Sequence, residues 1–143
     1  MKLRFLCAFS VALTLAGVRA QEADNEVEAR RVALELAGAF SNDGFKIRDG
    51  HWAGEVKNDS PAVIAVNLYA GNQYWFSVGS NEKDAKFSVT LNDETGQPVP
   101  ADDYHGEATA AAGFSPTTSG QYFVSISPSD PAAGTFCLVY SYK

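Results

Sequence analysis

Residues 66–80, VNLYAGNQYWFSVGS, place two apolar runs on either side of a glycine turn. Successive side chains of an extended strand point to opposite faces, so Tyr74, Phe76 and Val78 share one face and Trp75 lies on the other. Gly71 supplies the conformational freedom that a tight turn between two strands needs. The stretch therefore predicts two consecutive strands. It also raises the question whether Trp75 belongs to a core or to a binding surface.

The same alternation recurs after Phe45 in short runs rich in valine, isoleucine, aromatic residues and threonine. Glycine, asparagine, aspartate, serine and proline separate these runs, which is typical of turns. We expect strands at 45–48, 51–57, 62–69, 73–79, 85–92, 106–111, 120–127 and 134–142. About eight strands at this spacing predict an all-β domain, either a sandwich or a barrel.

Alternation also predicts which side chains form the core. Burying each large apolar side chain stabilises the fold by ~1.5–3 kcal/mol, so about a dozen of them can offset much of the chain entropy. Those that share one parity within their strands are Tyr74, Phe76, Val78, Phe87, Val89, Leu91, Tyr122, Val124, Ile126, Phe136, Leu138 and Tyr140.

The opposite faces of these strands carry Trp75 and Phe123, and an apolar patch of this kind is seldom left in water. Residues 24–41 lack proline and place apolar residues at helical spacing, which predicts an amphipathic helix. We expect this helix to lie over Trp75 and Phe123. The alternatives for the patch are an aromatic platform for a sugar or peptide and a dimer interface. The helix residues expected to make the contact are Val32, Leu36 and Phe40.

The first twenty residues, MKLRFLCAFSVALTLAGVRA, have the pattern of a secretory signal peptide. Basic residues precede an apolar run, and a small-x-small cleavage pattern ends at Ala20. The run is shorter than the ~20 residues that span a bilayer, so no membrane span is expected. The predicted organisation is a signal peptide at 1–20, an N-terminal helix at 21–44 and a β-sandwich domain at 45–143. The chain is expected to be secreted or periplasmic.

Cleavage would lower the number of basic residues from 11 to 8 against 17 acidic ones, which changes the net charge from −6 to −9. Nucleic acid is not expected as a partner, because phosphate binding needs clustered lysine and arginine. Cys137 would be the single remaining cysteine, so an internal disulfide is excluded. Its apolar neighbours predict a small buried side chain rather than a nucleophile.

Three motifs between residues 66 and 142 carry a family resemblance. They are a glycine turn with Gly71, Tyr74 and Phe76, an L-x-D-x-x-G hairpin with Leu91, Asp93 and Gly96, and a G-x-Y-x-V-x-I strand with Gly120, Tyr122, Val124 and Ile126. Together they resemble the bacterial pre-peptidase C-terminal domain (PPC-like domain). The resemblance implies a jelly-roll-like antiparallel β-sandwich that serves secreted bacterial enzymes as an accessory domain. It is similar to modules that bind collagen or carbohydrate.

The densest polar cluster lies in residues 99–107, VPADDYHGE. Asp102, Asp103, His105 and Glu107 offer ligands of the kind that calcium and related cations accept. The spacing of a dedicated calcium loop is missing, so a solvated acidic turn is the simpler interpretation. A small metal-dependent hydrolase built on this cluster is the enzyme alternative. No serine elbow or S-x-x-K motif is present, and we assign no catalytic residue.

Trp52 and Tyr104 are candidates for stacking on a ligand, with His105 beside Tyr104. Aromatic faces pack on sugar C–H groups much as they pack in cores, and burial of Trp52 at a sheet edge is the structural alternative. The sequence thus favours a secreted, non-catalytic binding or stabilising module for a protein or envelope partner. Carbohydrate binding is the second hypothesis. No cofactor is expected, with calcium left open.

Overall fold

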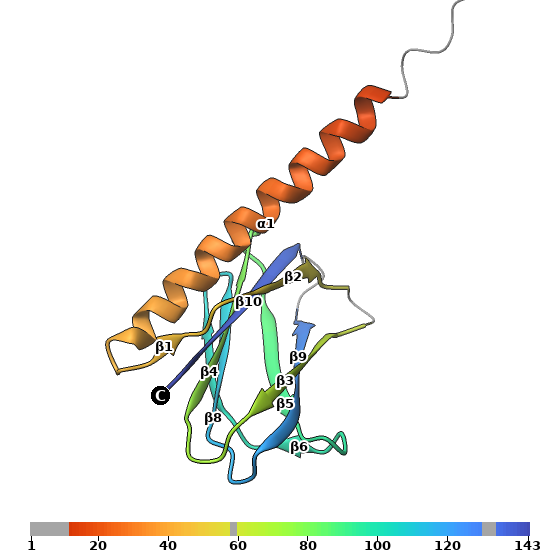
Figure 1. Ribbon diagram of the computed structural model, residues 1–143. Helices are drawn as coiled ribbons and strands as arrows, with labels where there is room; N and C mark the ends of the chain where they lie inside the picture. The colour runs from red at the N-terminus through yellow and green to blue at the C-terminus, as the bar shows by residue number, and fades with distance from the viewer. Residues whose placement is uncertain (1–11, 58–59, 130–133) are drawn as a thin grey trace, which may run out of the picture.

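Two antiparallel sheets pack face to face in the computed structural model, which describes residues 12–57, 60–129 and 134–143 (Figure 1). The all-β sandwich predicted from the sequence is confirmed. The first sheet contains β1 (Lys46–Ile47), β2 (Trp52–Glu55), β10 (Thr135–Tyr142), β4 (Tyr74–Ser80), β8 (Thr109–Phe114) and β7 (Asp102–Gly106). The second contains β3 (Ala62–Leu68), β9 (Gly120–Pro128), β5 (Phe87–Asn92) and β6 (Pro98–Val99).

The strand order is that of a jelly roll. One sheet has the order β2-β10-β4-β8 and the other has β3-β9-β5-β6. From β2 to β5, each consecutive strand therefore lies in the opposite sheet from the one before it. Two interlocked Greek keys produce this arrangement. The short β1 pairs with the end of β10, and β7 adds to the far edge beside β8. The eight expected strands correspond to β1–β5 and β8–β10, so the two further strands among the ten that the structure describes are β6 and β7.

The core lies between the two sheets. All twelve residues that alternation assigned to it are buried in a single cluster. Paired strands agree in phase, because Phe76 lies opposite Tyr140 in the first sheet and Leu91 lies opposite Val124 in the second. In each of these strand pairs, a core side chain therefore lies opposite another core side chain, and a shift by one residue would break this match.

Helix α1 (Ala12–Ser41) crosses the outer face of the first sheet (Figure 1). It ends at the expected residue and is followed by Gly44 at a φ of +89°. It begins earlier than residue 24, because the alanine and leucine residues before residue 24 favour a helix. Cleavage after Ala20 stays a prediction. Within the described residues, no helix has the length and hydropathy needed to cross a membrane.

The helix rests on the sheet through its smallest side chains. Ala29, Ala33 and Ala37 follow one another at helical-turn spacing and are fully buried against β10. At Gly79 in β4, an added Cβ would lie 2.4 Å from the backbone nitrogen of Ala33 and 2.8 Å from the carbonyl oxygen of Ala29. Only a glycine allows so close an approach of the helix backbone to the strand.

Trp75 lies under the helix, which answers the question about its face. The Phe40 ring stacks on it, with 4.3 Å between ring centroids and 6° between ring planes. Val32 and Leu36 are half-buried. The position expected for Phe123 is corrected by the strand order. β9 belongs to the second sheet, so Phe123 lies on the outer face remote from α1.

A further correction concerns the segment predicted as an acidic loop followed by a strand at 106–111. Asp102–Gly106 forms the edge strand β7, and Thr109–Phe114 forms β8. The turn between them uses Ala108 at a φ of +54°. A positive φ is uncommon for a residue other than glycine, so the sequence carries no strong turn signal at this position.

Candidate functional site

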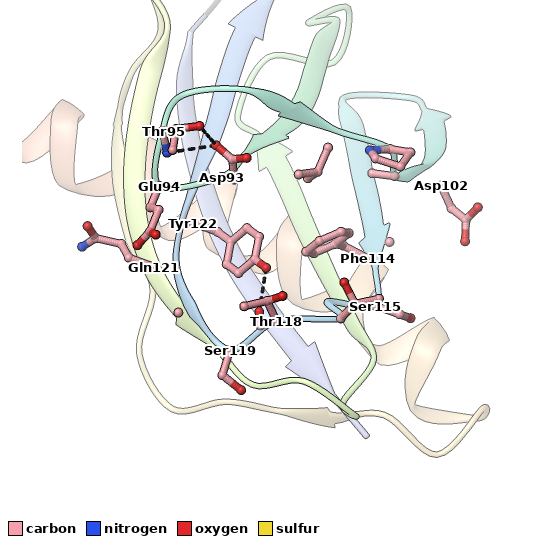
Figure 2. A pocket seen from close by; sticks show the side chains of 16 residues that line it. Asp93, Glu94, Thr95, Asp102, Phe114, Ser115, Thr118, Ser119, Gln121 and Tyr122 are labelled. Atoms are coloured by element: carbon pink, nitrogen blue, oxygen red, sulfur yellow. Dashed lines mark hydrogen bonds between the residues drawn. The ribbon is translucent and has the colours of Figure 1, made fainter.

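A polar cleft lies at one end of the sandwich, where the β5–β6 hairpin approaches the β8–β9 loop (Figure 2). Its volume is about 710 Å³. Such a cleft would suit a cation or a sugar if its oxygen atoms were free to bind. The carboxylates and hydroxyls that line it belong to Asp93, Glu94, Thr95, Asp102, Ser115, Thr117, Thr118, Ser119 and Tyr122.

Several oxygen atoms of the polar cleft hold its own loops together. The Asp93 carboxylate accepts hydrogen bonds from the Thr95 hydroxyl at 2.6 Å, the Thr95 N–H at 2.9 Å and the Gln97 N–H at 3.0 Å. The bond from the Thr95 side chain is the main cause that lowers the pKa of Asp93. The Tyr122 hydroxyl donates to the Thr118 carbonyl at 2.7 Å. Asp93 is therefore a turn-forming residue.

The four residues predicted as cation ligands do not converge. Alternation along β7 places Asp103 and His105 on one face and Asp102 on the other. His105 Nε2 and Asp103 Oδ2 are 2.9 Å apart and bind each other. Figure 2 shows Asp102 well apart from Asp93, while Glu107 lines a separate groove beside α1. Among the described residues, no group of three or more histidine, cysteine or acidic side chains could hold a metal ion.

The two residues predicted to stack on a sugar lie at opposite edges of the first sheet. Trp52 is in β2 and Tyr104 is in β7, with β10, β4 and β8 between them. At ~4.8 Å for each strand spacing, the two positions are about 19 Å apart, which is too far for one sugar ring. Tyr104 is exposed beside α1, whereas Trp52 lies in a cleft with other aromatic residues.

We call this second opening the aromatic cleft. It lies between the β2–β10 side of the first sheet and the β3 edge of the second, and its volume is about 580 Å³. Arg48 is the one charged residue among the described residues that line it, and Asn67 and Asn72 add amide groups. The aromatic side chains in its lining are Trp52, Tyr69, Tyr74, Tyr140 and Tyr142.

Close packing fixes the floor of the aromatic cleft. Tyr140 is buried, and Trp52 stacks on it with 5.8 Å between ring centroids and 15° between planes. The Arg48 guanidinium carbon lies 5.2 Å from the centroid of the Tyr140 ring, and the backbone N–H of Arg48 donates to the backbone carbonyl of Tyr140 at 2.9 Å. Burial raises the pKa of the Tyr140 phenol.

The rim of the aromatic cleft is the β3–β4 turn, in which Gly71 adopts a φ of +92°. The Tyr74 hydroxyl accepts hydrogen bonds from the Tyr69 N–H at 2.9 Å and from the Asn72 amide at 3.1 Å, which holds the turn in place. Tyr69 is 63% exposed and Tyr142 is 38% exposed. The turn thus presents free aromatic surface beside a fixed floor.

Sequence reasoning missed most of the aromatic cleft. It placed Tyr140 in the core, which is correct for burial, and it did not single out Arg48, Tyr69 or Tyr142. These residues come from separate segments that only the strand order brings together. One signal was present, because Tyr69 directly precedes the glycine turn with parity opposite to the core residue Leu68.

The face beneath α1 offers no comparable site among the described residues. Cys137 is fully buried there, and burial raises the pKa of its thiol to about 11, so it is not a reactive nucleophile at neutral pH. The hydroxyls of Ser77 and Ser141 are also buried and have no hydrogen-bond partner. They cost stability rather than form a site, because the helix closes this face to ligands.

No protein-family model and no curated protein matches the chain.

Proposed function

We propose that the chain is a secreted, non-catalytic binding module and that its ligand is a carbohydrate of the cell envelope or of the surrounding medium. The aromatic cleft is the binding site. One observation carries the proposal: aromatic rings, two amides and a guanidinium gather in an open cleft of about 580 Å³.

The chemistry of a sugar matches this lining. A sugar ring has C–H faces that pack on aromatic rings and hydroxyl groups that exchange hydrogen bonds with amides and guanidinium groups. Arg48, Asn67 and Asn72 supply these polar groups beside Trp52 and Tyr69. Tyrosine and tryptophan lose little conformational entropy on binding, and a largely preformed concave cleft suits a small ligand.

The cleft reverses the order of the two hypotheses drawn from the sequence. The sequence favoured a protein partner, but a specific protein interface buries about 800 Å² on each side, which calls for a broad surface rather than a cleft. A concave, aromatic cleft favours a small ligand instead. The residues change as well, because Trp52 is retained while Tyr69 and Tyr142 take the place of Tyr104.

The non-catalytic part of the proposal is supported by the cleft's lining. Most glycoside hydrolases use two carboxylates that flank the scissile bond, and none of the described residues that line the aromatic cleft carries one. Secretion is supported by the signal-peptide pattern at 1–20. The jelly-roll order accords with the resemblance to the PPC-like domain, which stays a prediction.

A pair of matched tyrosine variants tests the proposal. The mature chain is applied to a glycan array, and the best ligand is then titrated by calorimetry. Tyr69→Ala should weaken binding roughly tenfold or more, because an exposed ring at the rim contacts the ligand. Tyr104→Ala removes an exposed ring at the opposite edge and should leave affinity unchanged. Absence of any retained glycan, or equal losses in both variants, would contradict the proposal.

A further inference from the structure

Arg48 places a positive charge in the aromatic cleft. Its guanidinium lies over the Tyr140 ring, and the residue is exposed to solvent. Among the residues that the structure describes, no carboxylate forms an ion pair with it. The chain has 17 acidic residues, yet none of the described residues that line this cleft is one of them. The charge of Arg48 is therefore available to a ligand.

A second basic residue lies beside the aromatic cleft. Lys46 is opposite Tyr142 in the pairing of β1 with β10. The backbone N–H of Arg48 donates to the carbonyl of Tyr140, which continues the same pairing. Residues opposite each other in antiparallel strands share a face of the sheet, so both basic residues lie on the face of the two tyrosines that line the cleft. Two residues of extended chain separate Lys46 from Arg48 by about 7 Å.

The net charge of the chain acts over a longer range than these two cations. It is −6, and its field repels an anion that approaches from a distance. At physiological ionic strength, exposed charges are screened beyond about 8 Å. The groups that line the aromatic cleft therefore decide which ligand binds inside it. Because Arg48 is the charged group among its described lining residues, these groups are complementary to a sugar with negative charge.

A carboxylate on a sugar matches Arg48 better than a neutral hydroxyl does. A guanidinium presents its N–H donors in a planar fork that fits the two oxygens of a carboxylate. Hydrogen bonds between charged groups are also about twice as strong as neutral ones. A uronic acid carries this carboxylate on the same ring whose C–H face can pack on Trp52 or Tyr69.

We propose that the ligand of the aromatic cleft is an acidic glycan, in which the carboxylate of a uronic acid binds Arg48 and a further carboxylate of the same glycan lies near Lys46. This inference rests on the proposed carbohydrate function and narrows it to one class of sugar. Arg48 discriminates acidic from neutral sugars, whereas the aromatic rings of the cleft pack on both.

Matched acidic and neutral oligosaccharides test the inference. The mature chain is titrated by calorimetry with oligogalacturonate, oligomannuronate and oligoglucuronate, and with the carboxyl-reduced form of each, which keeps the sugar ring and removes the charge. At least one acidic oligosaccharide should bind about tenfold or more tightly than its reduced form. Arg48→Gln should abolish this preference. Lys46→Gln should lower it by less, because Lys46 lies beside the cleft and does not line it.

Lys86→Gln is the matched control. It removes the same charge from an exposed residue that directly precedes β5 in the second sheet, outside the lining of the aromatic cleft. It should leave the preference for the acidic oligosaccharide unchanged. Circular dichroism checks that all three variants fold.

The outcomes separate this inference from the proposed function. Neutral glycans that bind through Tyr69, without preference for any acidic oligosaccharide, overturn the acidic ligand and leave the carbohydrate function standing. Absence of binding to every glycan contradicts both. An acid preference that survives Arg48→Gln, or that Lys86→Gln abolishes equally, overturns the role of Arg48. A sugar phosphate that binds more tightly than every uronate overturns the assignment of a carboxylate.

Discussion

Replacing Gly79 by alanine tests how the helix is seated on the first sheet. The new methyl group would lie 2.4 Å from the Ala33 nitrogen, 2.8 Å from the Ala29 oxygen and 2.9 Å from the Val32 carbonyl carbon. Ordinary contact distances are about 3.5–4.0 Å, so α1 must withdraw by roughly 1 Å. These are backbone atoms, and no side-chain rotation can relieve the clash.

The sign of the change in unfolding free energy shows whether α1 is seated on Gly79. Overpacking of this kind costs about 1–3 kcal/mol, and a gap of up to ~1 Å also forfeits part of the attraction at the neighbouring contacts. Gly79 does not have a strained positive φ. If the helix were not seated there, alanine would stabilise the protein by about 0.4–1 kcal/mol, because it lowers the entropy of the unfolded chain.

Urea denaturation followed by tryptophan fluorescence measures this difference. Gly38→Ala is the matched control, since Gly38 lies in α1 with nothing within 4 Å of an added Cβ. It should raise the free energy of unfolding by about 0.5–1 kcal/mol. Stabilisation by both alanines would refute the close seating of α1 on β4.

Three further predictions concern single groups. Ser77→Ala should raise the melting temperature, because it removes a buried hydroxyl without a partner that costs about 1–3 kcal/mol, and a lower melting temperature would argue against that burial. The buried Cys137 thiol, with its pKa raised to about 11, should react with a thiol reagent at pH 8 far more slowly in the native chain than in urea, and equally fast labelling would contradict the sealed face. The pKa of Asp93 is lower in the folded chain than its ordinary value of 3.8, so its carboxylate stabilises the fold at pH values above 3.8. This stability is lost as the pH falls through the folded pKa, and Asp93→Asn should therefore flatten the acid side of a curve of unfolding free energy against pH. An unchanged curve would contradict the role of Asp93 in the turn.

Much of the fold could be predicted because a period of two marks buried faces directly. The alternation in Tyr74, Phe76 and Val78 recurs in phase along four long strands, and each of these residues proved buried. The same signal cannot tell which sheet a strand joins. Phe123 has the outward parity of Trp75, yet β9 lies in the other sheet, so the helix covers only Trp75.

The segment at 102–114 was harder to predict for two physical reasons. Its turn uses Ala108 with a positive φ, a conformation that alanine rarely adopts and that the sequence therefore does not predict. Its second strand is built on three consecutive alanines, which are poor strand formers and are buried between the core and α1. Burial on both faces, rather than intrinsic preference, stabilises this strand.

The candidate site could be predicted only in part. Trp52 could be singled out as a large aromatic residue among glycines, but its neighbours in the cleft depend on the pairing of β10 with β2 and on the position of β3 across the opening. Gly79 carried a usable signal, because a glycine within a strand often marks the close approach of another backbone.

The two tryptophans of the chain allow the most direct test of the proposed binding site. Trp52 lines the aromatic cleft, and Trp75 lies under Phe40 and α1. The indole N–H resonances are followed by ¹H–¹⁵N NMR while the best ligand from a glycan array is added. We predict a saturable shift of the Trp52 signal and an unmoved Trp75 signal. A shift confined to Trp75, or no shift at either indole with a glycan that binds, would contradict the assignment of the aromatic cleft as the site.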